Sequence, residues 1–89
     1  MAENNTTNQA ESDAQVLWDD VVELLGEEGT APALLAMLKS CQATTLTDDS
    51  LTIAAGTGFV RRNVEKNATA IEACLERAAF QPLGLTVEL

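Results

Sequence analysis

The stretch LTIAAGTGFVRRN, which spans Leu51–Asn63, contains the pattern in this sequence that most resembles a phosphate-binding turn. It predicts a short strand, a Gly-x-Gly turn at Gly56 and Gly58, and the start of a helix that carries Arg61 and Arg62. A strand that turns through glycines into a helix N-terminus commonly holds a phosphate, because free backbone N–H groups and the helix dipole favour an anion there. The stretch therefore raises the question of whether the protein binds a nucleotide or a nucleic acid.

The known nucleotide-binding motifs do not match this turn. A dinucleotide-binding fingerprint requires a third glycine where this chain has Arg61. A P-loop ends in Gly-Lys-Ser/Thr, whereas Gly58 is followed by Phe59. The Gly-x-Gly spacing of this turn also differs from the G-x-x-G that K-homology RNA-binding modules place between two helices. We therefore expect Gly56 and Gly58 to relieve strain where the strand turns into the helix, and we expect no cofactor.

The charge balance argues against general binding to nucleic acids or membranes. The chain has 89 residues and a net charge of -9, from 14 acidic and 5 basic residues, which repels phosphate-rich surfaces. Four of the five basic residues fall on one predicted helix, so a weak contact with nucleic acid stays open: Arg61, Arg62, Lys66 and Arg77. No secretory signal and no apolar run of about 20 residues is visible, which predicts a cytoplasmic protein without a membrane segment.

Residues for catalysis or metal binding are scarce. The chain has no histidine and no tyrosine, and Cys41 and Cys74 lack a metal-binding spacing. We expect two buried, reduced thiols, with a disulfide as the alternative. The carboxylate pairs Asp19-Asp20 and Asp48-Asp49 are expected on a solvated helix face and in a hairpin turn. The sequence therefore predicts no catalytic, metal-binding or cofactor-binding residue, and a protein that is not an enzyme.

The pattern along the chain predicts a tail and one domain. Residues 1–11 are polar and read as a disordered tail or linker, and residues 12–89 as a single α+β interaction domain. An S-x-x-Q capping box at Ser12 predicts a first helix, which ends near Leu25 with Gly26 as its stop. Thr30 is expected to cap a second helix, with Pro32 in its first turn, that continues to about residue 41.

The rest of the chain predicts a small sheet and one long helix. Residues 43–46 and 51–55 are expected to form a hairpin around Asp48-Asp49, and residues 85–89 a last strand. A helix is expected over residues 59–79, with a kink at Asn67. The order α-α-β-β-α-β favours a three-stranded sheet packed against helices, with the first strand in the centre.

This layout and a few short motifs resemble two bacterial replication modules. The motifs are Leu17-Trp18 in the first helix, Pro32 opening the second, a Leu-Thr-x-x-Ser-Leu-Thr-Ile hairpin from Leu46 to Ile53, and Phe59-Val60-Arg61 opening the third. They resemble the N-terminal domain of the replication initiator DnaA, of K-homology-like fold. The layout is also similar to the C-terminal domain of the gamma/tau subunit of DNA polymerase III, which docks on the polymerase subunit.

Several departures favour the tau-like alternative. Initiators usually have a second tryptophan where this chain has Lys39, and Pro-Asn where it has Thr57-Gly58. An acidic residue that some initiators use for helicase contact maps near Leu35. The polar tail is what a domain at the end of a linker would have, whereas Met1 is what an initiator would have. Both resemblances imply a non-catalytic protein-binding module, whose partner is a polymerase subunit or the replicative helicase. A homodimer also stays open.

The expected partner surface combines apolar side chains with neighbouring arginines. Trp18 and Val22 are expected at the edge of a wide apolar stripe, and Leu35 on a helix that has no polar side. Phe59 is expected outside the core stripe of its helix, next to the two arginines. Aromatic and arginine side chains are the usual anchors of protein interfaces. The alternative is that the two aromatic residues simply complete a small core. The predicted surface consists of Trp18, Val22, Leu35, Phe59, Arg61 and Arg62.

Overall fold

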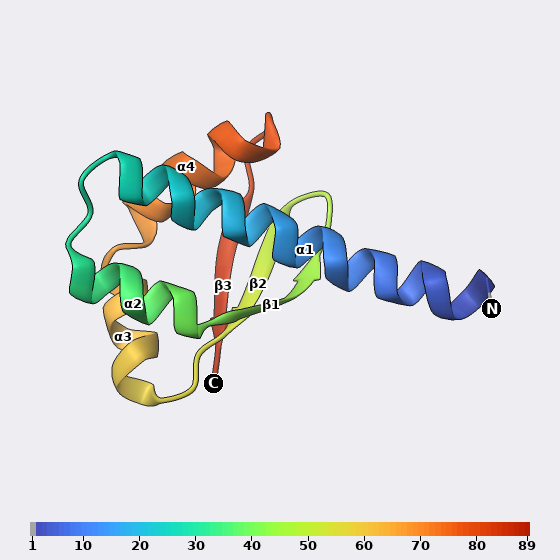
Figure 1. Ribbon diagram of the computed structural model, residues 1–89, viewed down its shortest axis with the longest axis horizontal. Helices are drawn as coiled ribbons and strands as arrows, with labels where there is room; N and C mark the ends of the chain where they lie inside the picture. The colour runs from blue at the N-terminus through green and yellow to red at the C-terminus, as the bar shows by residue number, and fades with distance from the viewer. Residues whose placement is uncertain (1) are drawn as a thin grey trace.

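The structure, a computed structural model, describes the backbone of residues 2–89 and the side chains from Asp13 onward. It is an α+β fold, as predicted, in which four helices accompany a three-stranded sheet (Figure 1). The helices are α1 (Ala2–Glu27), α2 (Pro32–Ser40), α3 (Gly58–Lys66) and α4 (Ala68–Ala79). The strands are β1 (Gln42–Leu46), β2 (Ser50–Ala54) and β3 (Gly84–Glu88).

The sheet is mixed, and its central strand is β2. It pairs antiparallel with β1, which confirms the hairpin, and parallel with β3. The prediction that the first strand lies in the centre is wrong. The physical reason is that β2 places Leu51 and Ile53 in the core at 0% exposure, whereas β1 has no buried residue and a register shift between Ala43 and Thr45.

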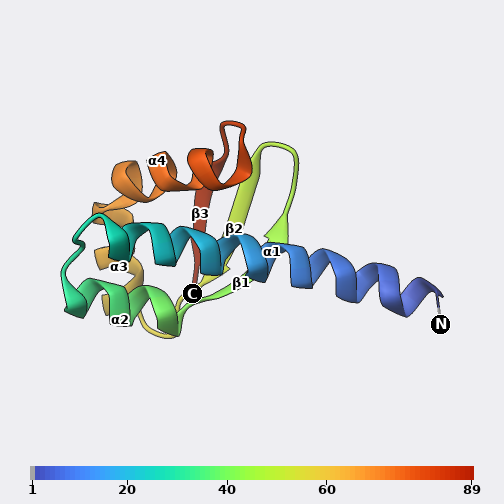
Figure 2. The same ribbon diagram turned by 45° about the horizontal axis from the view of Figure 1, so that its top comes forward.

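The helices pack against the sheet face that carries Leu51, Ile53 and Val87. Figures 1 and 2 show α1 crossing the sheet, with α4 beside its C-terminal half and α2 and α3 together at one end. The core is aliphatic except for one indole, as the scarcity of aromatic residues requires. Its largest fully buried side chains are Trp18, Leu38, Leu51, Ile53, Ile71 and Leu75.

Helix α1 begins at Ala2 and not after Ser12. The Gln15 side chain does not act in a capping box, because its Nε2 donates to Asp19 Oδ1 at 2.8 Å and its Oε1 accepts the Ala43 N–H of β1 at 3.1 Å. Gln15 thus ties the helix to the edge strand. The backbone of residues 2–11 continues the helix, and the division of the chain into a tail and a domain at residue 12 stays a prediction.

The C-terminus of α1 is set by Gly29, so the prediction that Gly26 stops the helix is wrong. Gly29 has a φ of 89°, in the left-handed region that glycine adopts without steric cost. The Thr30 N–H donates to Leu25 O at 3.1 Å and the Gly29 N–H to Gly26 O at 3.2 Å. These two bonds form a Schellman motif, which satisfies the last carbonyl groups of the helix.

Alanine substitutions at these two glycines should therefore change stability in opposite directions. Gly29→Ala should cost about 1–2 kcal/mol, because a Cβ disfavours left-handed backbone. Gly26→Ala should stabilise the protein by about 0.5–1 kcal/mol, since Gly26 is helical and its new Cβ would lie 3.7 Å from Leu35 Cδ1, an ordinary contact. Urea denaturation of both variants measures the difference. If Gly26→Ala destabilised the protein and Gly29→Ala did not, this assignment of the helix end would be wrong.

Two further helix boundaries differ from the sequence prediction. Ala31 and not Thr30 precedes α2, and its methyl side chain cannot make a capping bond. Pro32 begins the helix, where its missing N–H leaves one donor fewer to satisfy. The predicted kink at Asn67 is a full break between α3 and α4, with φ −108° and ψ 15°. There the Asn67 side chain donates from Nδ2 to Asn63 O at 2.8 Å, which satisfies a carbonyl at the end of α3.

Candidate protein-interaction surface

The described residues contain no cluster of three or more side chains that could hold a metal ion. Cys41 and Cys74 are free and buried, as predicted. Burial raises the pKa of both thiols, and for Cys74 the nearby Glu28 carboxylate raises the pKa further. A raised pKa leaves a thiol protonated and a poor nucleophile at neutral pH. Neither cysteine therefore has the environment of a reactive thiol.

The Gly-x-Gly turn is ordered by Thr57, whose Oγ1 accepts the Val60 N–H at 3.2 Å and caps α3. Gly56 and Gly58 do not have positive φ, and a Cβ at either position would meet no atom within 4 Å. The prediction that these glycines relieve strain is therefore wrong, because neither the backbone conformation nor a close contact requires glycine. The Thr57 hydroxyl already occupies one of the free N–H groups that a phosphate would use.

We expect this turn to bind no nucleotide. Titration of ATP, GTP and NAD into isotope-labelled protein should leave the amide signals of residues 56–62 in place. Saturable shifts centred on Gly58 and Arg61 would contradict this expectation. Any contact with DNA should disappear at physiological salt. The turn offers few basic side chains, so binding would release few of the counterions condensed on the DNA.

Trp18 lies inside the core and not on the surface. Its side chain is 1% exposed, and its Nε1 donates to Leu38 O at 3.1 Å, which joins α1 to α2. This is the position that the core-completing alternative predicted for Trp18. Val22 is also buried, at 7% exposure, and Leu35 on α2 is half-buried. Whether any of them contacts a partner stays a prediction.

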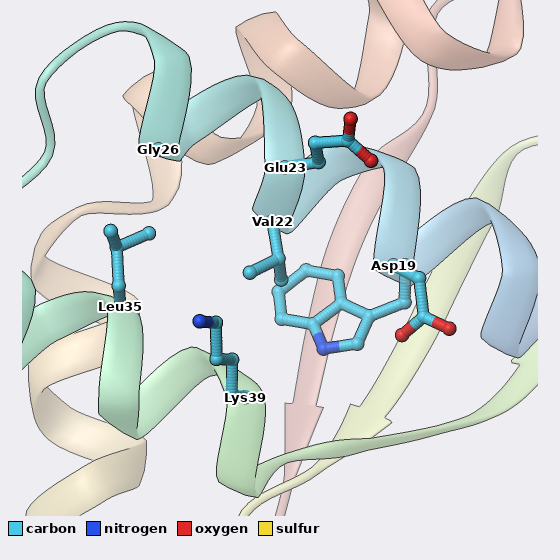
Figure 3. A pocket seen from close by; sticks show the side chains of 7 residues that line it. Asp19, Val22, Glu23, Gly26, Leu35 and Lys39 are labelled. Atoms are coloured by element: carbon cyan, nitrogen blue, oxygen red, sulfur yellow. The ribbon is translucent and has the colours of Figure 1, made fainter.

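A groove of about 500 Å³ runs between α1 and α2. Figure 3 shows Val22 and Leu35 facing each other across it, with Lys39 extending into its opening and the carboxylates of Asp19 and Glu23 on the α1 side. Trp18 and Gly26 complete the lining. Gly26 has no side chain, which leaves the wall of α1 open opposite Leu35. We call these seven residues the α1–α2 groove.

A second patch lies at the start of α3, and we call Phe59, Arg61 and Arg62 the α3 patch. Phe59 is 59% exposed, in agreement with its predicted position outside the core stripe. The Arg61 Nε lies 3.5 Å from Glu65 Oε2, so its charge is partly balanced within α3. The Arg62 guanidinium pairs with no carboxylate among the side chains that the structure describes. An exposed ring thus lies beside one free cation.

The structure divides the six predicted residues between these two features. Trp18, Val22 and Leu35 line the groove, and none of the groove residues lies on α3. The two features are neighbours, because α3 packs beside α2 (Figure 2). Sequence reasoning missed Lys39 and Glu23 on the groove rim, since neither was expected at the partner surface. It also missed Phe80, which is 94% exposed.

Comparison with known proteins gives no match to this chain, either among protein-family models or among curated proteins. Within residues 2–89, no helix is both long and apolar enough to cross a membrane.

Proposed function

We propose that this domain is a non-catalytic protein-binding module of the bacterial DNA replication machinery, most like the C-terminal domain of the gamma/tau subunit of DNA polymerase III. In this proposal it works in the cytoplasm and docks on the polymerase subunit. The observation that carries the proposal is the exposed Phe59 ring beside the free Arg62 guanidinium, next to an open groove. The Phe59 ring lies mostly outside the core, and aromatic and arginine side chains are enriched in protein interfaces.

The groove supports a protein ligand better than a small molecule. Its walls are apolar where Val22 and Leu35 face each other, and its rim carries both signs of charge from Glu23 and Lys39. A helix or extended segment with one apolar side chain could fill it while polar groups pair at the rim. The neighbouring α3 patch would extend the contact. The apolar groove would then form the buried centre of the interface, and the charged side chains around it would form the polar rim.

The alternative function is that of the N-terminal domain of the replication initiator DnaA, with self-association and helicase contacts. Phe59-Val60 at the start of α3 favours this alternative, because the resemblance to initiators includes that pair. Both proposed functions use the exposed Phe59 ring. The identity of the partner, and not the position of the surface, therefore distinguishes them. Binding to nucleic acid is a weaker candidate, because Arg61 is already paired with Glu65 and the net charge is -9.

Calorimetric titration separates these functions. The domain should bind the polymerase subunit of its own organism, and bind the helicase more weakly or not at all. Tight helicase binding without polymerase binding would select the initiator alternative. Sedimentation of the domain alone measures self-association. Failure to bind either protein would contradict a role in replication.

A further inference from the structure

Phe80 is exposed in a way that folding does not explain. It ends α4 with φ 61° and ψ 25°, the left-handed conformation in which glycine is strongly preferred. Its side chain is 94% exposed, so it contributes almost no buried apolar area in return for that backbone conformation. A residue that neither packs nor suits its backbone is a reason to look for a function.

The neighbouring face of α1 is acidic and its carboxylates are unpaired. Asp20, Glu23 and Glu27 recur at helical spacing, and none of them pairs with a basic group within the part of the chain whose side chains are described. Like charges three or four residues apart weaken a helix. Glu27 lies in the last turn of α1, which has no basic residue, so the helix dipole also disfavours it. A cation brought by another molecule would relieve both effects.

Phe80 and this acidic face border one cleft. The cleft has a volume of about 300 Å³ and lies between α1 and α4, which pack side by side (Figure 1). Leu24 and Ala78 are half-buried and form an apolar floor, and Phe80 stands at the edge. Arg77 also lines the cleft, but its guanidinium pairs with Glu28. Val16, which is 59% exposed, lies one turn before Asp20 on the same face of α1.

We propose that this Phe80 cleft is a second docking site, which takes a basic amphipathic segment of a partner protein. The apolar face of such a segment would cover Phe80, Leu24 and Ala78. Its lysine or arginine side chains would pair with Asp20, Glu23 and Glu27, and could stack on the Phe80 ring. The charge of the cleft excludes an acidic partner. Glu23 also lies on the rim of the α1–α2 groove, so the two sites share one carboxylate. The proposal does not otherwise depend on binding at that groove, on the α3 patch or on a role in replication.

The probe is a synthetic helical peptide with leucine on one face and lysine on the other, and the control peptide has glutamine in place of lysine. On titration with the lysine peptide, amide shifts should centre on residues 24, 27 and 78–80. Phe80→Gly should weaken binding about tenfold. The same substitution should leave the melting temperature unchanged or raise it, because glycine suits the left-handed backbone. The double variant Asp20→Asn with Glu27→Gln should weaken binding similarly and reduce its salt dependence.

Two variants serve as matched controls. Glu88→Gln removes an exposed carboxylate from β3, and Phe59→Ala removes the exposed ring of the other surface, so both should bind the peptide as the wild type does. Wild-type affinity in Phe80→Gly, or equal losses in Glu88→Gln and in the Asp20 and Glu27 double variant, would overturn the proposal. So would a lower melting temperature in Phe80→Gly, which would give Phe80 a structural role. Failure of the protein to bind replication subunits would leave these outcomes unaffected.

Discussion

Replacing Trp18 with alanine is expected to lower the free energy of unfolding by about 3–5 kcal/mol, the usual cost of truncating a buried aromatic side chain. Trp18 is the largest of the fully buried side chains, and the core offers no other ring to fill the space. Small domains are stable by only about 5–15 kcal/mol, so a domain near the lower end would be largely unfolded. The loss would be mainly one of packing. Leu38 O would keep the Cys41 N–H as a donor at 3.2 Å after the indole N–H is gone.

Trp18→Phe separates packing from hydrogen bonding. It keeps most of the apolar volume and removes only the Nε1 donor, so we expect a cost of about 1 kcal/mol from the lost hydrogen bond, plus a small cavity. Urea denaturation followed by circular dichroism measures both variants without relying on tryptophan fluorescence. A Trp18→Ala protein with wild-type stability would contradict the assignment of Trp18 to the core.

Phe59→Ala is expected to leave folding stability nearly unchanged and to weaken partner binding. Phe59 is 59% exposed at the start of α3, so its truncation should change folding stability by no more than about 0.5 kcal/mol, as for most surface substitutions. The same truncation should weaken the complex with the partner by about 2 kcal/mol, which is roughly a thirtyfold rise in Kd. Thermal melting and calorimetric titration of the same preparation give both numbers.

The matched control is Phe80→Gly, which removes an even more exposed ring on another face. It should leave binding at the α3 patch unchanged. Arg62→Gln tests the charged part of the patch, and should slow association more than it speeds dissociation. If Phe59→Ala unfolded the protein, Phe59 would belong to the core. If it stayed folded and bound the partner as the wild type does, the proposed surface would be wrong.

The parts of the fold that could be predicted from the sequence are those set by local patterns. Alternating apolar residues around Leu51 and Ile53 identified β2, and Asp48-Asp49 identified the hairpin. Asn67 was expected to kink one long helix, whereas it separates α3 from α4. The order of strands was not predictable in this way, because it depends on β3 returning beside β2 after two helices. The end of α1 was assigned to the wrong glycine, since only the backbone angle of Gly29 distinguishes the two.

The candidate site shows the same limit. A helical wheel placed Trp18 at the edge of its apolar stripe, and its burial depends on α2 lying against that edge, which no local pattern specifies. Phe59 was correctly expected on the surface, because it leaves a well-defined stripe. Phe80 was missed for a related reason. Its position after α4 gave no sign that the backbone there is left-handed or that the acidic face of α1 lies beside it.

The central claim is that the α1–α2 groove and the α3 patch form a protein-binding surface, and mapping of amide shifts tests it most directly. The isotope-labelled domain is titrated with the unlabelled polymerase subunit, and in parallel with the helicase. We predict saturable shifts or broadening centred on Phe59 and Arg62 and extending to Leu35 and Lys39, with one of the two proteins. Shifts confined to the open face of the sheet, or none with either protein at concentrations well above micromolar, would contradict the account.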